Sequence, residues 1–444
     1  MFRTATRTIK AGRPALKASL APAAAAATAS MKTAKLSHYD EVLEESSSEK
    51  NDLLVSTFNP AIQFSPESLR GASEILRSGD QPRSFFTYEP NKVRAAVSLW
   101  QQLLPDVTPY FALKANPHPL ILETVVQSGA SIDCASKAEM EAVMGICGTV
   151  NNVILSNPCK DVHHLAYAHE HGVPLTVVDS VEEMEKVTAT CPDIGVMIRI
   201  SVSNENARFV LGNKFGCSLD MVDTIARRFA GRANLVGISF HVGSVNEDPA
   251  SFVDAMKLAE RACTLLWSHG FSNARTINMG GGYTSSSFRS IAPIIQSNMN
   301  PNLQYIAEPG RFFVEESCNL FLQVTTKRTL DGNTVEYTMN DGLYGSLNCN
   351  VYDLYAGYVT PTQLFPYCDA QGRPKTAAAG NAERPSRFWG PTCDGCDKIG
   401  KGPVPFPDMD VGDWCLIPKV GAYINPGASF NGFEGADMYP VGAA

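Results

Sequence analysis

The sequence lacks several features that mark other classes of protein. It contains no uninterrupted apolar run of roughly 18 residues, the length that a membrane-spanning helix requires. Basic residues are scarce, since 37 Lys and Arg stand against 45 Asp and Glu, and the formal net charge is -8. No basic block follows the first few dozen residues. We therefore expect a soluble protein with neither a nucleic-acid nor a membrane partner.

Cysteine pairs of the kind that staple small secreted domains are also absent. The 12 Cys are spread singly through 444 residues, which is typical of reduced thiols in an intracellular compartment. The CxxC segment from Cys393 to Cys396 has no second CxxC and no paired His at ligand spacing to accompany it. A structural zinc site needs four such ligands, so no metal is predicted.

Acidic residues are missing from the first 39 positions. Basic residues alternate there with Ala, Ser and Thr, at Arg3, Arg7, Lys10, Arg13, Lys17, Lys32 and Lys35. Such composition is typical of an organellar transit peptide, and residues 21–30 lack the Leu/Val block of a secretory signal. A disordered tail, with translation starting at Met31, is the alternative. Residues 1–36 are thus expected to be a disordered arm or a transit peptide, in a cytoplasmic or an organellar (mitochondrial or plastid) protein.

Beyond about residue 105, short apolar or β-branched runs alternate with segments of helical period. The candidate strands are 109–116, 131–136, 153–157, 175–180, 195–200, 235–244, 276–283 and 304–310. Amphipathic stretches such as 137–147 and 249–269 lie between them. Near-continuous apolar strands separated by helices indicate a parallel sheet buried on both faces, and about eight such units predict a closed, TIM-like (β/α)₈ barrel. An open doubly wound sheet is the alternative.

After residue 311 the pattern changes to period-two strands broken by Gly, Pro and Asn. Candidate strands are 321–328, 335–340 and 413–418. This pattern predicts a second, mainly antiparallel β domain of sandwich or barrel-like form. Residues 369–385 are small, polar and without period, so a mobile surface excursion is expected there. The expected α/β organisation has the N-terminal part of the β domain at 37–88, the barrel at 89–317 and the C-terminal β domain at 318–444.

Polar residues fall at or just past the C-terminal ends of the candidate barrel strands. They are Lys114, Asp133, Arg199, His241, Gly280, Gly281, Gly282 and Glu308. A barrel carries its active site on that face. A single Lys or Glu at a strand end is more often solvated than catalytic, but the joint placement of these residues on one rim predicts a site.

Several of these groups match the chemistry of pyridoxal phosphate. Lys114 ends a strand inside an apolar stretch, where desolvation is expected to lower the pKa of its amine and let it form an imine with a carbonyl cofactor. Glycines 280–282, ahead of a helical stretch, offer backbone N–H groups to a phosphate. Glu308 supplies an anion for a pyridinium nitrogen, and Arg311 supplies a guanidinium for a phosphate.

His241 follows a strand in the segment FHVGS. Taken singly, it would be interpreted as a packed core histidine. Beside a pyridoxal ring it is expected to stack on one face of the ring, with Ser244 reaching the phosphate.

A series of motifs runs through the chain from about residue 59 to residue 433. In order they are YFALKAN, DCASKAE, FHVGS, GGGY, EPGRFFV, NDGLYGSLNCNVYD, WGPTCDGCD and GAY. With these motifs the sequence resembles the eukaryotic ornithine decarboxylases, group IV pyridoxal-phosphate-dependent decarboxylases with an alanine-racemase-like fold. The resemblance implies pyridoxal 5'-phosphate as cofactor and decarboxylation of L-ornithine to putrescine and CO2, the first step of polyamine biosynthesis.

For the cofactor, the resemblance implies a set of residues in the barrel mouth. Lys114 would hold it covalently, and Glu308 would pair with its ring nitrogen. Asp133 would lie near the lysine, Arg199 near the ring's 3-oxygen and His241 against the ring. The phosphate would be bound by Ser244, Gly280, Gly281, Gly282, Arg311 and Tyr423.

For the substrate, the resemblance implies a head-to-tail homodimer whose two active sites are shared across the interface. Cys393 would act in the site of the other subunit as the proton donor after CO2 leaves, and Asp394 would there face the substrate's distal ammonium. Asp353, which follows Tyr352, would bind the same ammonium. Two carboxylates select a substrate with a cationic far end. An antizyme-type regulator is a further implied partner.

Two alternatives to this function stay open. A lysine or dual ornithine/lysine decarboxylase, forming cadaverine, differs by one substrate methylene, which is worth only about 1–3 kcal/mol. The chain departs from the family near this end of the site, because Leu354 follows Asp353 where the animal enzymes carry His. Residues 284–287 also replace the usual Phe-Pro-Gly, and Cys396 replaces an apolar residue. The other alternative is an inactive, antizyme-inhibitor-like regulatory paralogue, which would be expected to lose cofactor or proton-donor residues that are present here.

Overall fold

A computed structural model of the chain describes residues 65–79, 83–203, 207–209, 214–330, 333–348, 364–373, 375, 383–424 and 431–442. The expected arm at 1–36 lies outside the described residues, as do Tyr352 and Asp353. No helix within the described ranges is both long and apolar enough to cross a membrane. The cysteines that the structure describes are all free thiols.

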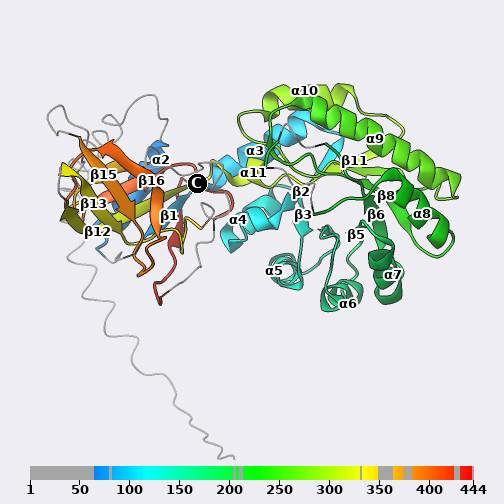
Figure 1. The fold of residues 1–444 in the computed structure, drawn as a ribbon, viewed down its shortest axis with the longest axis horizontal. Coiled ribbons are helices and arrows are strands. Elements are labelled where there is room, and N and C mark those ends of the chain that lie inside the picture. The colour runs from blue at the N-terminus through cyan, green and yellow to red at the C-terminus, as the bar shows by residue number, and fades with distance from the viewer. Residues whose placement is uncertain are drawn as a thin grey trace, which may run out of the picture. The chain divides into compact units, whose positions relative to one another are not determined.

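Eight parallel strands close into a barrel (Figure 1). They are β2 (Val107–Ala112), β3 (Ser131–Cys134), β4 (Val153–Leu155), β5 (Leu175–Val178), β6 (Gly195–Arg199), β8 (Leu235–Ser239), β10 (Thr276–Asn278) and β11 (Gln304–Ala307). The strands follow chain order around the barrel, and β11 pairs with β2 to close it. The prediction of a (β/α)₈ barrel is confirmed, and the alternative of an open sheet is wrong.

Helices surround the barrel strands (Figure 1). They are α3 (Pro90–Leu103), α4 (Pro119–Gln127), α5 (Lys137–Cys147), α6 (Val162–Glu170), α7 (Val181–Thr190), α8 (Leu219–Phe229), α9 (Pro249–Ser268) and α10 (Phe288–Ser297). Helix α8 shows why they pack as they do, because Val222, Ile225, Ala226 and Phe229 form one buried stripe at helical spacing. The side chain of Ser218 accepts a hydrogen bond from a backbone N–H and so caps its N-terminus.

The predicted barrel strands are too long at their C-terminal ends. Lys114 lies not in a strand but in the one-turn helix η1 (Leu113–Ala115). The chain also leaves the sheet after Ser239 and after Asn278. Gly280 has φ +61° and Gly282 has φ +116°, values that a strand does not accommodate. The polar residues of the rim therefore sit in loops above the strands.

A second sheet has eight strands. They are β1 (Phe85–Tyr88), β12 (Cys318–Thr329), β13 (Val335–Met339), β14 (Phe365–Cys368), β15 (Arg384–Trp389), β16 (Lys398–Phe406), β17 (Trp414–Ile417) and β18 (Asp437–Pro440). The order is β14-β17-β12-β13-β15-β16, and β1 pairs with β12 and β18. Only β1 with β18 and β13 with β15 are parallel pairs, so the mainly antiparallel prediction is confirmed. Strand β15 begins at Arg384, so the surface excursion predicted at 369–385 extends past the point where this strand begins.

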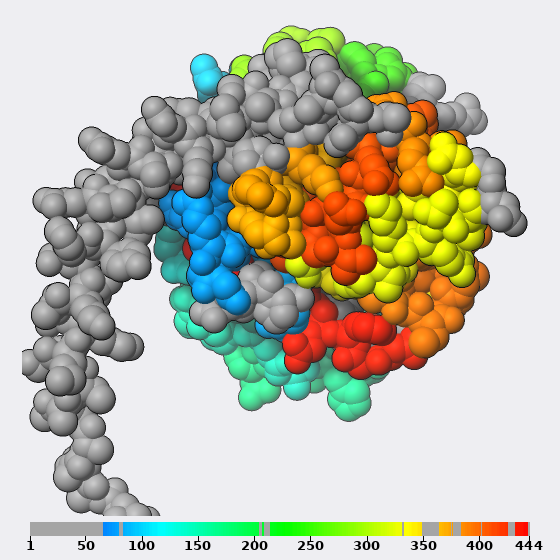
Figure 2. Space-filling model, turned by 90° about the vertical axis from the view of Figure 1, so that its left-hand side faces the viewer, coloured from blue at the N-terminus to red at the C-terminus, as the bar shows by residue number. Residues whose placement is uncertain are grey.

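Both ends of the described chain contribute to this second sheet. Phe85 of β1 stacks on Phe321 of β12 with ring centroids 4.8 Å apart. Helix α2 (Pro66–Arg77) packs nearby, and its Leu69 carbonyl accepts a hydrogen bond from the Tyr367 hydroxyl (2.8 Å). In Figure 2 the N-terminal residues, in blue, accordingly lie beside orange and red C-terminal segments. The barrel is thus inserted between the strands of one β domain.

Candidate active site

The turn that carries Lys114 is held by the segment that follows β17. The side-chain amide of Asn116 donates to the Gly421 carbonyl (2.9 Å). The Tyr423 N–H donates to the Ala115 carbonyl (2.5 Å). The YFALKAN and GAY motifs, which are 305 residues apart at the bond between Asn116 and Gly421, therefore meet in one hydrogen-bonded structure around Lys114.

The amine of Lys114 faces several acids. Its side chain remains accessible to solvent, but the protein packed around it desolvates its charge, which by itself lowers its pKa. The acidic groups of Asp133 and Glu308 oppose this effect, and the pKa of Lys114 is raised. The prediction of a lowered pKa is wrong because it counted desolvation and not the acids that the barrel brings to the same rim.

Asp133 lies at the end of β3 and is buried. Its Oδ1 atom has no hydrogen-bond partner among the described residues. Immediately after it, the DCASKAE motif forms a capping box at the start of α5. The Glu139 N–H donates to Ser136 Oγ (3.3 Å), and the Ala135 N–H donates to Glu139 Oε2 (2.6 Å). Ser136 and Glu139 of this motif thus fix the backbone that follows Asp133.

Glu308 follows β11 and is only 9% exposed. Burial, and then repulsion from Asp133, raise the pKa of its carboxyl to about 7, against the opposing influence of Lys114. The side-chain amide of Asn278 donates to Glu308 Oε1 (2.6 Å). Glu308 is therefore a carboxyl that can gain or lose a proton near neutral pH.

His241 presents a neutral imidazole to the site. Burial, followed by the positive charges of Arg199 and Lys114, holds its pKa well below the usual range. The Gly243 N–H donates to His241 Nδ1 (3.0 Å), so the ring proton is on Nε2. An uncharged ring suits stacking on an aromatic cofactor and adds no cation beside Lys114.

The three glycines after β10 come close to their neighbours. A Cβ atom would lie 2.4 Å from the Phe240 carbonyl oxygen at Gly280, and 2.7 Å from the Gly243 carbonyl oxygen at Gly282. At Gly281 it would lie 3.0 Å from His241 Nε2. A side chain at any of these three positions would crowd its neighbours, so glycine is required there, and backbone alone lines this part of the rim.

Arg311 begins the short helix α11 (Arg311–Val314) and is 4% exposed. Its guanidinium lies over the Tyr423 ring, 4.8 Å from the ring centroid, and Tyr423 itself has a left-handed backbone with φ +58°. Behind the helix, the Trp100 ring packs against Phe312 and Phe313 with centroids 6.3 and 6.0 Å away. This aromatic cluster anchors α11 and so positions the guanidinium.

Two other predicted cofactor residues occupy the same side of the barrel. Arg199 ends β6, lies over the Phe215 ring at 5.4 Å and acts electrostatically on Glu308 and Asp133. Ser244 begins the short strand β9 (Ser244–Asn246), which pairs with β7 (Ala207–Phe209) and is not part of the barrel. It stands one residue after Gly243, close to the glycine segment.

These groups fit pyridoxal phosphate. The rim combines an amine, a carboxyl that titrates near neutrality, guanidiniums and a glycine segment without side chains, which match the aldehyde, ring nitrogen and phosphate of that molecule. The orphaned Oδ1 atom of Asp133 is a buried acceptor that a bound group can satisfy. The donor set contains no metal cluster, since no group of three or more His, Cys, Asp or Glu able to hold an ion occurs within the described ranges.

Cys393 and Asp394 lie elsewhere, in the turn between β15 and β16. Cys393 is exposed. Asp394 accepts hydrogen bonds from the Tyr344 hydroxyl and from the Cys396 N–H (2.8 Å), and the bond from Tyr344 is the main cause that lowers its pKa. The Cys393 N–H donates to Asn431 Oδ1 (3.4 Å). Among the described residues, the hydrogen bonds of this turn lie within the β domain, and none joins it to the barrel mouth.

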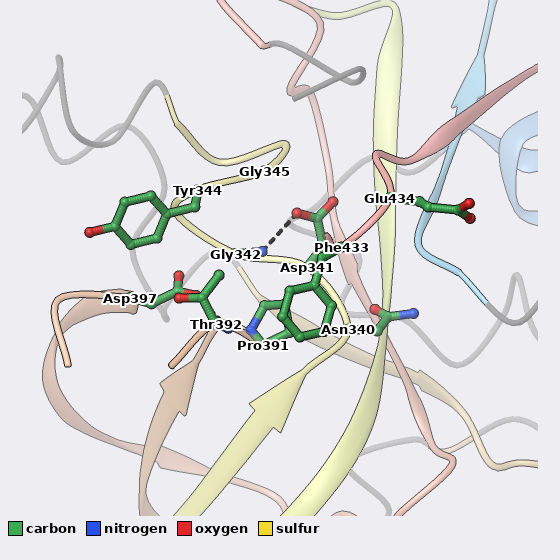
Figure 3. Close-up of a pocket in the computed structure, with 10 residues that line it drawn as sticks. All are labelled: Asn340, Asp341, Gly342, Tyr344, Gly345, Pro391, Thr392, Asp397, Phe433 and Glu434. Carbon is green, nitrogen blue, oxygen red and sulfur yellow. Dashed lines mark hydrogen bonds between the residues drawn. The ribbon is translucent and has the colours of Figure 1, made fainter. Parts of the chain in front are cut away.

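Residues on both sides of Cys393 and Asp394 help to line a pocket that three segments of the β domain form, 340–345, 391–397 and 433–434 (Figure 3). The pocket is lined by Asn340, Asp341, Gly342, Tyr344, Gly345, Pro391, Thr392, Asp397, Phe433 and Glu434. Asp397 joins the loops, because its carboxylate accepts from the Leu343 N–H (2.8 Å) and from the Thr392 N–H and hydroxyl (3.0 and 2.6 Å). The Asp341 carboxylate likewise accepts from the Gly342 N–H (2.7 Å). Cys393 and Asp394 are thus presented by a well-braced pair of loops.

Sequence reasoning missed some residues of this arrangement. Asn278, Tyr344 and Asp397 each contact a predicted site residue or hold the loop that carries one. Tyr344 and Asp397 lie inside motifs already singled out, and Asn278 stands two positions before the first glycine. Their motif membership is a signal, but their contacts depend on the fold.

Comparison with known proteins agrees with the geometry. Residues 90–315 match the family model of the pyridoxal binding domain of pyridoxal-dependent decarboxylases. The chain is 36% identical, over 79% of its length and 82% of the relative's, to the ornithine decarboxylase of Schizosaccharomyces pombe. It belongs to the pyridoxal-dependent decarboxylase family, as the sequence motifs predicted, and pyridoxal phosphate is its cofactor.

Solved structures of the same fold belong to decarboxylases that are named for several basic amino acids. The arginine decarboxylase of Paramecium bursaria Chlorella virus, bound to agmatine, superposes with a TM-score of 0.76 at 29% identity, over 84% of this chain and all of that one. The lysine/ornithine decarboxylase of Vibrio vulnificus, complexed with putrescine, gives a TM-score of 0.73 at 25% identity, over 83% of this chain and 98% of that one.

Proposed function

We propose that this enzyme decarboxylates L-ornithine to putrescine and CO2, the first step of polyamine biosynthesis. The observation that carries the proposal is the gathering of Lys114, Glu308 and Arg311 at one rim of the barrel, within a chain of the decarboxylase family. The substrate assignment is supported by relatives that are named ornithine decarboxylase. The presence of these residues argues against an inactive regulatory paralogue.

Bound pyridoxal phosphate would draw electrons from the substrate α-carbon, so that CO2 can leave. Glu308 would hold a proton at the ring nitrogen, and its pKa of about 7 suits a group that shares a proton at neutral pH. Lys114 would hold the cofactor until substrate replaces it. Neutral His241 would orient the ring. Arg311 with Gly281 and Gly282 would hold the phosphate, because the Gly280 N–H already donates to Asn278 Oδ1 (2.9 Å). The α-carbon would regain a proton from Cys393.

Carboxylates would bind the ammonium group at the distal end of the substrate. Asp394 is kept ionised by its bond from Tyr344, and Asp353 would supply a second negative charge from outside the described residues. A substrate without a terminal cation would leave both carboxylates unpaired. A lysine or dual ornithine/lysine decarboxylase is the second candidate, favoured by the similarity to the Vibrio vulnificus enzyme, whose name includes both substrates.

We further propose that two copies of the chain share their active sites. The hydrogen bonds of the turn that carries Cys393 and Asp394 support this arrangement, since those described stay within the β domain and leave both side chains able to serve the barrel of a second copy. Mixing Lys114→Ala and Cys393→Ala proteins tests it. If random exchange of subunits leaves one intact site in each mixed dimer, about a quarter of the parental activity should return. No recovery despite demonstrated subunit exchange would refute sharing.

The substrate is tested by CO2 release from purified protein with added pyridoxal phosphate. L-ornithine, L-lysine, L-arginine and meso-diaminopimelate are compared at matched concentrations, with Lys114→Ala as the blank. A clear preference for ornithine is expected. A preference for lysine would replace the first candidate by the second, and silence on all four substrates would overturn the proposed activity.

The compartment and the regulator are proposed from the sequence alone. Residues 1–36 would direct the protein to an organelle, and fusion of this segment to a fluorescent protein tests that role. Diffuse cytoplasmic fluorescence would favour a disordered arm. Binding of an antizyme-type regulator is tested by co-purification with a tagged antizyme, and its absence would leave the dimer without that control.

A further inference from the structure

Asn278 closes a ring of three hydrogen bonds at the edge of the site. The Glu308 N–H donates to the Gly280 carbonyl (2.7 Å), and the Gly280 N–H donates to Asn278 Oδ1 (2.9 Å). The Asn278 Nδ2–H then donates to Glu308 Oε1 (2.6 Å). Asn278 has no exposed surface. The ring therefore connects the first glycine of the rim with the carboxyl expected at the ring nitrogen.

The ring allows only one orientation of the Asn278 amide. A backbone N–H can only donate, so the oxygen of the amide must face Gly280 and its nitrogen must face Glu308. The nitrogen in turn needs an acceptor, which an ionised carboxylate provides on either oxygen. The fold thus places a fixed, uncharged donor against one oxygen of Glu308 and leaves the other oxygen for the cofactor.

The remaining groups that act on Glu308 explain why such a donor is useful. Burial and the Asp133 carboxylate disfavour its anion, and Lys114 and Arg199 favour it. Tyr283 also lies within electrostatic reach, and neutral His241 contributes no charge. The bond from Asn278 is made within the protein and does not depend on the group that Lys114 binds.

We infer that Asn278 is a positioning residue, which favours the ionised form of the Glu308 carboxyl and aims it at the cofactor's ring nitrogen. The inference rests on the proposed function only for its kinetic consequence. Its structural consequence, the protonation of the ring nitrogen, concerns the bound cofactor alone and can be measured without turnover.

Two substitutions separate the donor from the shape of the side chain. Asn278→Leu keeps a similar volume and removes both hydrogen bonds of the side chain. Asn278→Asp is nearly isosteric and keeps the acceptor for the Gly280 N–H. Its second oxygen can donate to Glu308 only while the aspartate is protonated. As the pH rises, the two carboxyls would repel each other and lose their shared proton.

The chain offers a matched control in the β domain. Asn319 is also buried, donates through Nδ2 to Ser68 Oγ (2.8 Å) and to Glu89 Oε1 (3.3 Å), and accepts from the Lys419 N–H (3.1 Å). Asn319→Asp and Asn319→Leu disturb an equivalent network away from the cofactor. They report the general cost of altering a buried Asn that faces a Glu.

The experiment measures cofactor protonation and turnover in parent, both Asn278 variants and both controls. Ring nitrogen protonation is followed by 15N NMR of bound, ring-labelled pyridoxal phosphate between pH 6 and 9, and kcat is measured over the same range. Loss of a hydrogen bond to a charged group should lower kcat of Asn278→Leu by about 10- to 100-fold. The 15N shift should move toward that of the unprotonated ring. Asn278→Asp should resemble the parent at low pH and lose activity and protonation as the pH rises.

The variants and the parent enzyme each give a result that can overturn a part of this inference or of the proposed function. Parental kcat and 15N shift in Asn278→Leu would overturn the inference. A loss in Asn278→Asp that does not depend on pH, or the same pH profile in Asn319→Asp, would also overturn it, because a general packing role would then suffice. If the parent bound the cofactor but released no CO2, the proposed function would fail, whereas the 15N comparison would still decide the role of Asn278.

Discussion

Replacing Glu308 by Gln should make the cofactor-free protein more stable and the loaded enzyme less active. Glutamine keeps an oxygen that accepts from Asn278 Nδ2, and its amide N–H can face the Asp133 carboxylate. It removes an ionisable group whose charged form is disfavoured by burial. The native Glu308 would thus lower the stability of the cofactor-free protein while it supplies a carboxyl of the required acidity.

The size of this effect follows from the pKa of Glu308. The carboxyl has a pKa of about 7 in the folded chain against an ordinary 4.5, which corresponds to roughly 3 kcal/mol of unfolding free energy. Below about pH 4.5 both states carry the proton and the group contributes nothing. Between about pH 4.5 and 7 unfolding releases a proton, so stability falls as the pH rises, and above pH 7 the full loss is present.

Chemical denaturation of the cofactor-free proteins measures this prediction. Glu308→Gln should exceed the parent by on the order of 3 kcal/mol at pH 8, and the difference should shrink steadily toward pH 5. Its activity should fall by about 100-fold or more after the cofactor is added back. Glu316→Gln, which alters a more exposed carboxylate paired with Lys419, is the control and should change stability by less than about 1 kcal/mol. A Glu308→Gln protein that is less stable than the parent at pH 8, or a gain that does not vary with pH, would refute the reasoning.

Other substitutions test separate parts of the molecule. Lys160→Met should cost about 3 kcal/mol in urea denaturation, because it removes a buried amine bonded to the Val177 carbonyl (2.6 Å) and to Glu183; a change below about 0.5 kcal/mol would contradict the pairing. Gly280→Ala should weaken cofactor binding by about tenfold or more in a fluorescence titration, since its Cβ would meet the Phe240 carbonyl oxygen at 2.4 Å, and parental affinity would show that the loop can shift. Tyr344→Phe should lower kcat/KM for ornithine by about tenfold by freeing Asp394, while cofactor affinity stays unchanged; unchanged kinetics would remove the role of that bond. Treatment with EDTA should leave the activity unchanged. A loss of activity that added zinc reverses would instead indicate a metal site at Cys393 and Cys396.

The barrel and its rim were accessible from the sequence because both depend on local pattern. Apolar runs such as 195–200 identify buried parallel strands, and a single topological rule then places the residues after each strand on one face. Lys114 and Glu308 could therefore be assigned to one site without coordinates. The strand ends could not, because a strand stops where the backbone turns, and at Gly280 the turn depends on a positive φ.

The electrostatics of the site could not be predicted in the same way. The sign of the Lys114 pKa shift depends on how desolvation balances against Asp133 and Glu308, which pattern alone does not give. Asn278 resembles any polar residue before a glycine turn, and its role emerges only when β10 and β11 are neighbours. The hydrogen bonds that hold the Cys393 turn within the β domain are likewise a property of the fold and not of motif order.

The hydrogen bonds between the lysine turn and the GAY segment have a consequence for biosynthesis. A ribosome adds about 5–20 residues per second, so the turn that carries Lys114 is made well before Tyr423 exists to hold it. The barrel strands are all made by Ala307, but the GAY segment follows β17 and is made more than 100 residues later. A chain cut short before Gly421 would therefore carry Lys114 on a turn that lacks these hydrogen bonds, and tight loading with pyridoxal phosphate should mark chains that have been synthesised through this segment.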